Sequence, residues 1–203
     1  EHFVRLAEHY DLINELTWLV MNKSVDWLAE LPNTIAEQPG LEGLTTRLCN
    51  ISLSINISAK SLSHPTLFAD FAAICVAKGI EPQRIYLELT ETHAMENPLA
   101  SLDTLTRLRV KGFNLSIDDF GTGYSSMKQL VRLPFSEIKV DKSFVMSAME
   151  SDESRSITQS IVELGNSLNL ATTAEGIEDD ETLHLLKSHH CSLAQGFRIS
   201  KPL

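Results

Sequence analysis

The chain has 203 residues, of which 43% are hydrophobic and 22% are charged. A chain of this length and composition can bury a core, which excludes disordered, collagen-like and small disulfide-rich proteins. Its 17 Lys and Arg residues against 27 Asp and Glu residues give a formal net charge of −10. This is the opposite of the basic surface with which proteins grip nucleic acid, so DNA and RNA are not expected as partners.

Cysteine usage and hydropathy indicate a cytoplasmic protein. Cys49, Cys75 and Cys191 form no CxxC pair, and an odd number of cysteines suits free thiols in a reducing compartment. The sequence contains no run of 18 apolar residues and no signal-peptide pattern. It begins with Glu1 and not with Met, which suggests that an upstream part is missing.

The first part of the chain is predicted to be helical. Apolar residues at three- and four-residue spacing over residues 3–27 indicate one or two helices that end near Pro32. Proline and glycine then mark residues 32–50 as a loop, with an extended segment at 44–49 as an open alternative.

Strands and helices alternate through the rest of the chain. Alternating or short apolar runs predict strands at residues 51–57, 85–91, 113–118, 137–141, 171–175 and 195–199. Helices are predicted at 62–78, 98–111, 125–133, 154–168 and 179–189, with Asn97 as N-cap and Pro98 in the first turn of the second. This order predicts an α/β fold of parallel strands with helices outside, and six strands favour a (β/α) barrel over an open sheet.

Polar side chains repeat on one face of these strands and gather at the strand ends. The residues concerned are Asn56, Glu88, Asp118, Lys139, Glu175 and Gln195. Barrel enzymes assemble their sites at the C-terminal ends of the strands, so this ring predicts a functional site. The alternative is a solvated face of an edge strand.

The ring is rich in oxygen ligands. Its metal candidates, with the neighbouring Asp119 and Glu178, include no His or Cys, which favours Mg²⁺, Mn²⁺ or Ca²⁺ over Zn²⁺ or copper. Adjacent Asp118 and Asp119 would let one carboxylate bridge two ions, as in two-metal phosphoryl transfer, although such a pair also suits a helix N-cap or a turn. Lys139 could steady a water or a phosphate oxygen, or instead form a structural ion pair with Asp141.

Seven short motifs follow one another along residues 3–203. They are FVRLAE (3–8), SINIS (54–58), ELTE (88–91), DDFGTGYSS (118–126), IKVD (138–141), AEGIE (174–178) and QGF (195–197) leading to KPL (201–203). In this order they resemble the EAL domain family, bacterial phosphodiesterases that hydrolyse cyclic di-GMP to a linear dinucleotide. The resemblance implies a TIM-like (β/α)8 barrel in which residues 1–203 form a single domain. It also implies that the first strand is absent, with its Glu-Ala-Leu motif, its ligand glutamate and the substrate-binding arginine that follows.

The resemblance also implies roles for individual residues. Asn56, Glu88 and Asp118 correspond to ligands of a first ion, Asp118 and Asp119 to ligands of a second, and Glu175 to a direct or water-mediated ligand. Lys139 corresponds to the lysine that contacts the catalytic water, with Asp119 and Glu175 beside it as catalytic residues. Gln195 and Glu178 correspond to substrate-binding residues, and Glu91 to the anchor of the loop after Asp119. The implied cofactors are two Mg²⁺ or Mn²⁺ ions, with Ca²⁺ as a candidate inhibitor.

Partners and alternatives complete the expectation. The resemblance implies cyclic di-GMP as substrate, pGpG as product, a homodimer through the loop and helix after Asp119, and fused sensory or diguanylate-cyclase domains in a parent protein anchored to the inner membrane. A catalytically inactive cyclic di-GMP receptor remains the alternative, and the chain as given is a candidate inactive fragment. A purely structural partner domain would leave the carboxylates without a purpose.

Overall fold

The computed structural model describes residues 2–36, 51–96, 98–123 and 127–201. Two compact units can be distinguished, one made of Glu1–Glu88 with Asp103–Asn114 and the other of Leu89–Leu102 with Leu115–Leu203. Helix α7 (Pro98–Val110) and strands β2 (Ile85–Thr90) and β3 (Asn114–Phe120) pass from one unit to the other. No helix in the described parts of the chain combines the length and apolar character needed to cross a membrane.

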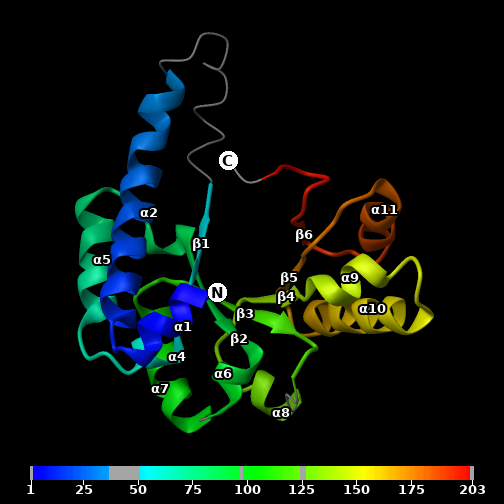
Figure 1. Ribbon diagram of the computed structural model, residues 1–203, viewed down its shortest axis with the longest axis horizontal. Helices are drawn as coiled ribbons and strands as arrows, with labels where there is room; N and C mark the ends of the chain where they lie inside the picture. Colours follow the sequence, from blue (N-terminus) through cyan, green and yellow to red (C-terminus); the bar gives the residue numbers. More distant parts are fainter. Residues whose placement is uncertain (1, 37–50, 97, 124–126, 202–203) are drawn as a thin grey trace. The chain divides into compact units, whose positions relative to one another are not determined.

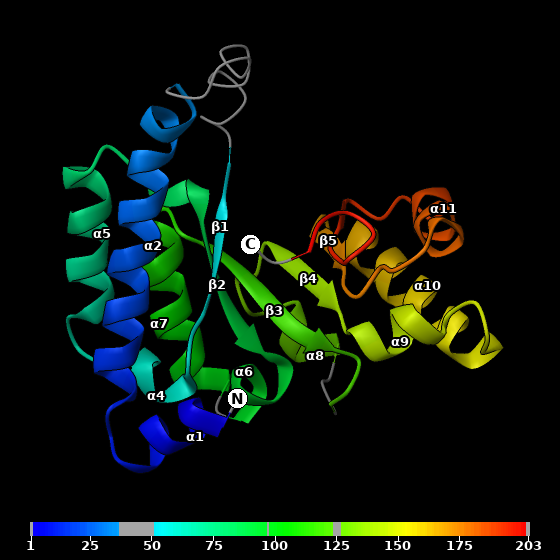
Figure 2. The same cartoon turned by 45° about the horizontal axis from the view of Figure 1, so that its top comes forward.

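The first unit is a helical layer against a parallel strand pair. It holds α1 (His2–His9), α2 (Ile13–Ala36), β1 (Leu53–Asn56), α4 (Ala59–Leu62), α5 (Leu67–Ala77) and the 3₁₀ turn η2 (Pro82–Arg84). Helices α2 and α5 lie side by side (Figures 1 and 2). Met21, Val25 and Leu28 follow one another at helical spacing on the buried face of α2. Phe71 of α5 stacks on Phe113 at a ring distance of 5.5 Å.

The second unit contains four parallel strands. Strand β3 pairs with β4 (Glu137–Val140), β4 with β5 (Ala171–Ala174), and β5 with β6 (Leu193–Ala194). Its helices are α6 (Glu91–Glu96), α8 (Met127–Leu130), α9 (Lys142–Ser147), α10 (Asp152–Ser167) and α11 (Asp180–Ser188). Helix α10 packs on β4, β5 and α9. All four residues of β4 are buried, so this strand lies at the centre of the unit's core.

Several predicted elements differ from the structure. Helix α2 continues through Pro32 to Ala36, although proline removes one backbone hydrogen bond. The helix predicted at 62–78 is divided into α4 and α5 around Pro65, which cannot donate the bond that a continuous helix would need. The strand predicted at 195–199 is wrong, because β6 precedes it and residues 196–199 turn back through bonds from Ile199 N to Gly196 O.

The structure also contains two helices that were not predicted, and some predictions concern residues outside the described ranges. Helices α6 and α9 were not expected, since each is only 6 residues long and follows a strand directly. The extended alternative at residues 44–49, the N-cap at Asn97 and the start of the helix expected at 125 fall outside the described residues.

Close packing of α10 on β5 gives a testable consequence. A Cβ added to Gly165 of α10 would lie 2.2 Å from Thr172 Cγ2, a separation that real atoms do not adopt. We expect Gly165→Ala to lower the free energy of unfolding by about 2 kcal/mol, as overpacked core positions do. Urea unfolding measures this, with Ser160→Ala on the exposed side of α10 as control. Equal midpoints for the two variants would contradict the close approach.

Candidate metal-binding site

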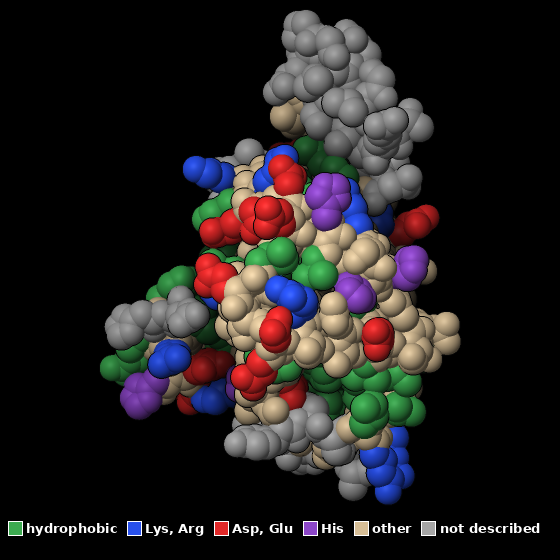
Figure 3. Space-filling model, turned by 90° about the vertical axis from the view of Figure 1, so that its right-hand side faces the viewer, with side chains coloured by type: hydrophobic (Ala, Val, Ile, Leu, Met, Phe, Trp, Pro, Cys, Tyr) green, Lys and Arg blue, Asp and Glu red, His purple; other side chains and the backbone are tan. Residues whose placement is uncertain are grey.

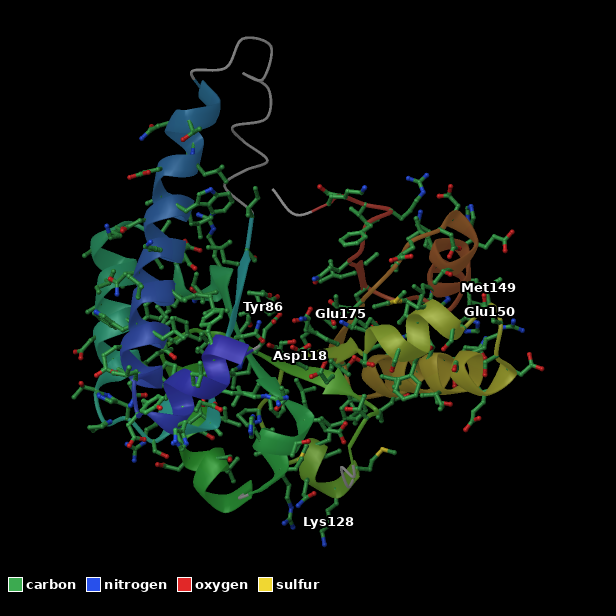
Figure 4. The ribbon with its side chains drawn as sticks, viewed as in Figure 1. Tyr86, Asp118, Lys128, Met149, Glu150 and Glu175 are labelled. Carbon is green, nitrogen blue, oxygen red and sulfur yellow. The ribbon has the colours of Figure 1, made fainter. Side chains whose placement is uncertain are left out.

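Three carboxylates meet at the C-terminal ends of β3 and β5 in the second unit. Asp118 and Asp119 belong to β3, and Glu175 directly follows β5 (Figure 4). One oxygen from each of the three lies within 4.8 Å of the others, and all three side chains are half-buried. Carboxylates this close repel one another, so the cluster favours a bound cation.

A β-bulge brings the two aspartates to one side. Ile117 pairs with Ile138 and Phe120 with Val140, so Asp118 and Asp119 together stand opposite Lys139 alone. Asp119 has φ of 54°, a left-handed conformation that aspartate tolerates better than most residues. In a regular strand, neighbouring side chains would point to opposite faces. Bulges of this kind re-aim a side chain, and they are frequent beside active sites.

The ammonium group of Lys139 bridges the cluster. Lys139 is 5% exposed, and its Nζ lies 3.1 Å from Asp118 Oδ1 and 2.6 Å from Glu175 Oε1. Asp141, the alternative partner considered from the sequence, serves as N-cap of α9 and accepts a bond from Ser143 N at 2.9 Å. Lys139 is therefore held by the residues expected to bind metal.

The donor set fits a divalent cation. Burial raises the pKa of Asp119, and the charges of Asp118, Asp141 and Glu175 raise it further. Asp118 Oδ1 is buried and accepts no well-aligned hydrogen bond from the described residues, which leaves the Lys139 ammonium as its compensating charge. Hard anionic oxygens with excess negative charge are what Mg²⁺ and Mn²⁺ select.

Asn56 and Glu88 lie opposite each other in the first unit. They are register partners at the ends of β1 and β2, where Ile57 N donates to Glu88 O at 2.8 Å. The Asn56 side chain is exposed, and Glu88 is 3% exposed. The sequence analysis also placed both residues near the ends of their strands. Their roles as metal ligands stay predictions.

Glu91 holds the glycine-rich loop that follows β3. Glu91 is buried, and its Oε2 accepts bonds from Gly121 N at 2.9 Å and Gly123 N at 3.1 Å. A Cβ at Gly123 would lie 2.9 Å from Glu91 Cδ, so glycine permits this approach. The contacts fix the backbone immediately after Asp118 and Asp119.

The contacts of Glu91 predict a graded mutational effect. Glu91→Ala leaves two amide groups without their charged acceptor and should cost roughly 3 kcal/mol of unfolding free energy. Glu91→Gln retains an acceptor oxygen and should cost about 1 kcal/mol. Hydrogen exchange at the amides of Gly121 and Gly123 provides the local readout. Slow exchange retained in Glu91→Ala would argue against the anchor.

Gln195 and Glu178 lie near the ends of β6 and β5. Gln195 N donates to Ala174 O at 2.9 Å, and Ile177 N donates to Gln195 O at 3.1 Å. The side chains of Gln195 and Glu178 are exposed, as residues that meet a ligand from solvent would be. Their substrate-binding roles also stay predictions.

Sequence reasoning missed a polar layer below the cluster. Ser116, Glu137 and Thr173 are buried, each two residues before Asp118, Lys139 or Glu175. The two-residue alternation of strands would have found them, because it assigns each to the same face as the residue two positions later.

One face of the second unit's helices carries charged side chains of both signs. Figure 3 faces the side that carries α9, α10 and α11, where Asp and Glu side chains occur at several places with Lys and Arg side chains between them.

Comparisons with known proteins agree on one family. The family model described as EAL domain matches residues 1–202. The cyclic di-GMP phosphodiesterase RocR of Pseudomonas aeruginosa is 32% identical over 100% of this chain and 48% of its own length. The oxygen sensor protein DosP of Escherichia coli is 38% identical over 99% of this chain and 24% of its own length. The chain thus spans half or less of these relatives.

Solved structures give the same result. The PaMucR phosphodiesterase in complex with c-di-GMP has a TM-score of 0.85 and 32% identity, covering 100% of this chain and 77% of that chain. Klebsiella pneumoniae BlrP1 with manganese and cyclic di-GMP at pH 6 has a TM-score of 0.78 and 29% identity, covering 92% of this chain and 44% of that chain. These likenesses confirm the α/β barrel class predicted from the sequence. With the family model matching almost every residue, the chain belongs to the EAL domain family.

Proposed function

We propose that this domain is a metal-dependent phosphodiesterase that hydrolyses cyclic di-GMP to linear pGpG. The observation that carries the proposal is the cluster of Asp118, Asp119 and Glu175 around the Lys139 ammonium. It stands in a family whose relatives include RocR, named a cyclic di-GMP phosphodiesterase, and solved domains that hold this dinucleotide.

The residues that would hold two Mg²⁺ or Mn²⁺ ions are Asn56, Glu88, Asp118, Asp119 and Glu175. Bound divalent cations at such a site lower the pKa of a water molecule and stabilise the charge on phosphate oxygens. They also reverse the local field, so a chain with net charge −10 can accept an anionic substrate. The solved complexes of BlrP1 with manganese and with calcium support a divalent cation as the cofactor.

The protein's own residues position the reactants. The Lys139 ammonium would orient the attacking water or a non-bridging phosphate oxygen, since it lies between Asp118 and Glu175. Glu91 keeps the backbone after Asp118 and Asp119 fixed through Gly121 and Gly123. Gln195 and Glu178 would contact the substrate.

Product analysis tests the proposal. The protein that contains this domain is incubated with cyclic di-GMP and Mg²⁺, Mn²⁺, Ca²⁺ or a chelator, and the nucleotides are separated. We expect linear pGpG with Mg²⁺ or Mn²⁺, none with chelator and little with Ca²⁺. Asp118→Asn should lose the activity, whereas Asp103→Asn on the exposed face of α7 should keep it. Binding without any product would support a cyclic di-GMP receptor instead.

Assembly is also proposed from the described surface. Met127 and Val131, in and just after α8, are 60% and 61% exposed, which supports a homodimer through the helix after the Asp119 loop. Relatives such as MucR, named a bifunctional diguanylate cyclase and phosphodiesterase, support additional domains in the whole protein. Sedimentation of the double variant Met127→Glu, Val131→Glu should give half the mass of the unmodified protein, and an unchanged mass would argue against this surface.

A further inference from the structure

A second polar layer lies below the carboxylate cluster in the second unit. Ser116, Glu137 and Thr173 each precede a residue of the cluster layer by two positions on β3, β4 and β5. Ser116 is the register partner of Glu137, whereas Thr173 is the register partner of Lys139 and reaches Glu137 diagonally across the strand pair. Because side chains two positions apart share a face of a strand, both layers point to the same side.

Glu137 is a buried carboxylate in this lower layer. It is 4% exposed, and Thr173, which is 6% exposed, donates a hydrogen bond from Oγ1 to Glu137 Oε1 at 2.5 Å. Ser116 is fully buried, and its hydroxyl makes no hydrogen bond within the described residues. A buried carboxylate is costly unless it is both hydrogen-bonded and compensated by positive charge. The Thr173 hydroxyl supplies a hydrogen bond to Glu137 but no positive charge.

Lys139 can supply the positive charge that compensates the Glu137 carboxylate. Strands β3, β4 and β5 contain no other Lys or Arg. Glu137 and Lys139 are two positions apart on one face, a separation of about 6.6 Å along a strand, which two long side chains can span. The ammonium itself lies on the upper layer, against Asp118 and Glu175.

Cation binding would change this balance. A divalent ion held by Asp118 and Glu175 shares those carboxylates with an ammonium that now lies 3.1 Å and 2.6 Å from them. The two positive charges repel, and the ion removes much of the negative charge that holds the ammonium in its upper position. Glu137, two positions before Lys139 on the same face of β4, is held by Thr173 and would then attract the ammonium.

We propose that Glu137 is a positioning residue for Lys139. Its carboxylate draws the ammonium away from Asp118 and Glu175 when divalent cations bind, and then holds it in a fixed place for the reaction. Thr173 orients the carboxylate. The kinetic part of this inference rests on the proposed phosphodiesterase function, whereas the part on cation binding can be measured without turnover.

A double-mutant cycle on Mn²⁺ binding tests the inference. Electron paramagnetic resonance of free Mn²⁺ gives the dissociation constant of the purified full-length protein, of Glu137→Gln, of Lys139→Met and of the double variant. We expect Glu137→Gln to weaken binding about tenfold and Lys139→Met to tighten it. In the Lys139→Met background, Glu137→Gln should change binding by less than about twofold, since coupled residues are non-additive. Equal weakening in both backgrounds would overturn the inference.

Steady-state kinetics provides the second readout. At saturating Mn²⁺, Glu137→Gln should lower kcat about tenfold and leave KM within about twofold, because the ammonium acts on the chemical step. Thr173→Val should show a smaller loss in the same direction, and Ser116→Ala, a small buried change in the same layer, should show none. Melting temperatures in chelator verify folding of each variant.

The outcomes separate this inference from the proposed function. No turnover by the unmodified protein, with the Mn²⁺ cycle behaving as expected, would overturn the proposed reaction and leave the pairing of Glu137 with Lys139. Turnover by the unmodified protein, with Glu137→Gln equal to it in both Mn²⁺ binding and kcat, would overturn the inference alone. Absence of Mn²⁺ binding to the unmodified protein would overturn both.

Discussion

Replacing Lys139 by methionine is expected to abolish turnover and to destabilise the protein only while divalent cations are absent. The ammonium lies between Asp118 and Glu175, whose side chains are 14% and 16% exposed. Removing one partner of a buried ion pair leaves uncompensated charge and costs several kcal/mol. Because these carboxylates retain some solvent, we expect a loss of about 2 kcal/mol.

Divalent cations should reverse the loss of stability but not the loss of activity. Bound Mn²⁺ would supply the positive charge that Asp118 and Glu175 lost, so urea midpoints in Mn²⁺ should approach those of the unmodified protein. Loss of a group that orients a water or stabilises charge should lower kcat by a factor of about 100 or more. The measurement is urea unfolding in chelator and in Mn²⁺, together with kcat.

A matched control separates this effect from a general loss of lysine. Lys60 pairs with Asp11 at 3.3 Å, but these side chains are 54% and 88% exposed. Lys60→Met should therefore change the free energy of unfolding by less than about 0.5 kcal/mol. If Lys139→Met were destabilised equally in chelator and in Mn²⁺, Lys139 would have a purely structural role.

The positions of the clustered side chains were predictable because strand alternation is strictly periodic. Asp118 and Lys139 lie near the ends of their strands and Glu175 directly follows its strand, and the sequence places these strands within a few residues of their observed bounds. Parallel strands with helical connections bring such ends to one edge. The two-residue period of the strands and the order of strands and helices along the chain were sufficient to predict this grouping.

The bulge at Asp118 and Asp119 was not predictable from the same reasoning. Strict alternation sends the two side chains to opposite faces, and only the left-handed φ of 54° at Asp119 returns it toward Asp118. Aspartate can adopt the left-handed backbone conformation but usually does not, so the presence of Asp119 in the sequence does not predict the bulge. Glu137 was missed for another reason: alternation along β4 assigns it to the face of Lys139, but no motif includes the first residue of this strand.

Short elements were not predicted correctly where the local sequence pattern was weak. Strand β6 has only 2 residues, and its position depends on the backbone pairing of Gln195 N with Ala174 O. Helix α9 begins at the Asp141 cap, where the sequence indicated a strand end and left an ion pair with Lys139 as an open alternative. For β6 a tertiary contact decided between alternatives that the local pattern left equal, and for α9 the local bond from Ser143 N to the Asp141 side chain did so.

Asp119→Asn is expected to stabilise the protein in the absence of metal while abolishing activity. Burial and the charges of Asp118, Asp141 and Glu175 raise the pKa of Asp119 in the folded state. Asparagine is close in size and tolerates the left-handed backbone at this position, so the substitution removes charge with little change in conformation. We expect a gain of about 1 kcal/mol at pH 7, or a rise in Tm of roughly 2 to 4 °C.

The pH dependence has a defined sign. A raised carboxyl pKa means that ionised Asp119 disfavours the folded state, and this cost is fully present above the folded pKa. As pH falls through the folded pKa toward the unfolded value of about 3.9, the folded protein takes up the proton and the cost disappears. The Tm difference between Asp119→Asn and the unmodified protein should therefore shrink on acidification. A difference that grows toward low pH would contradict the raised pKa.

Metal addition should invert the order of stability. If Asp119 is a ligand, Mn²⁺ stabilises the unmodified protein by an amount that depends on its affinity, and the variant gains less. Asp103→Asn, which removes an exposed partner of Arg107 on α7, should change stability by less than about 0.5 kcal/mol under both conditions. We therefore expect the unmodified protein to be less stable than Asp119→Asn without cations and more stable than it with Mn²⁺. This result would mean that the charge of Asp119 serves to bind the ion and does not stabilise the fold.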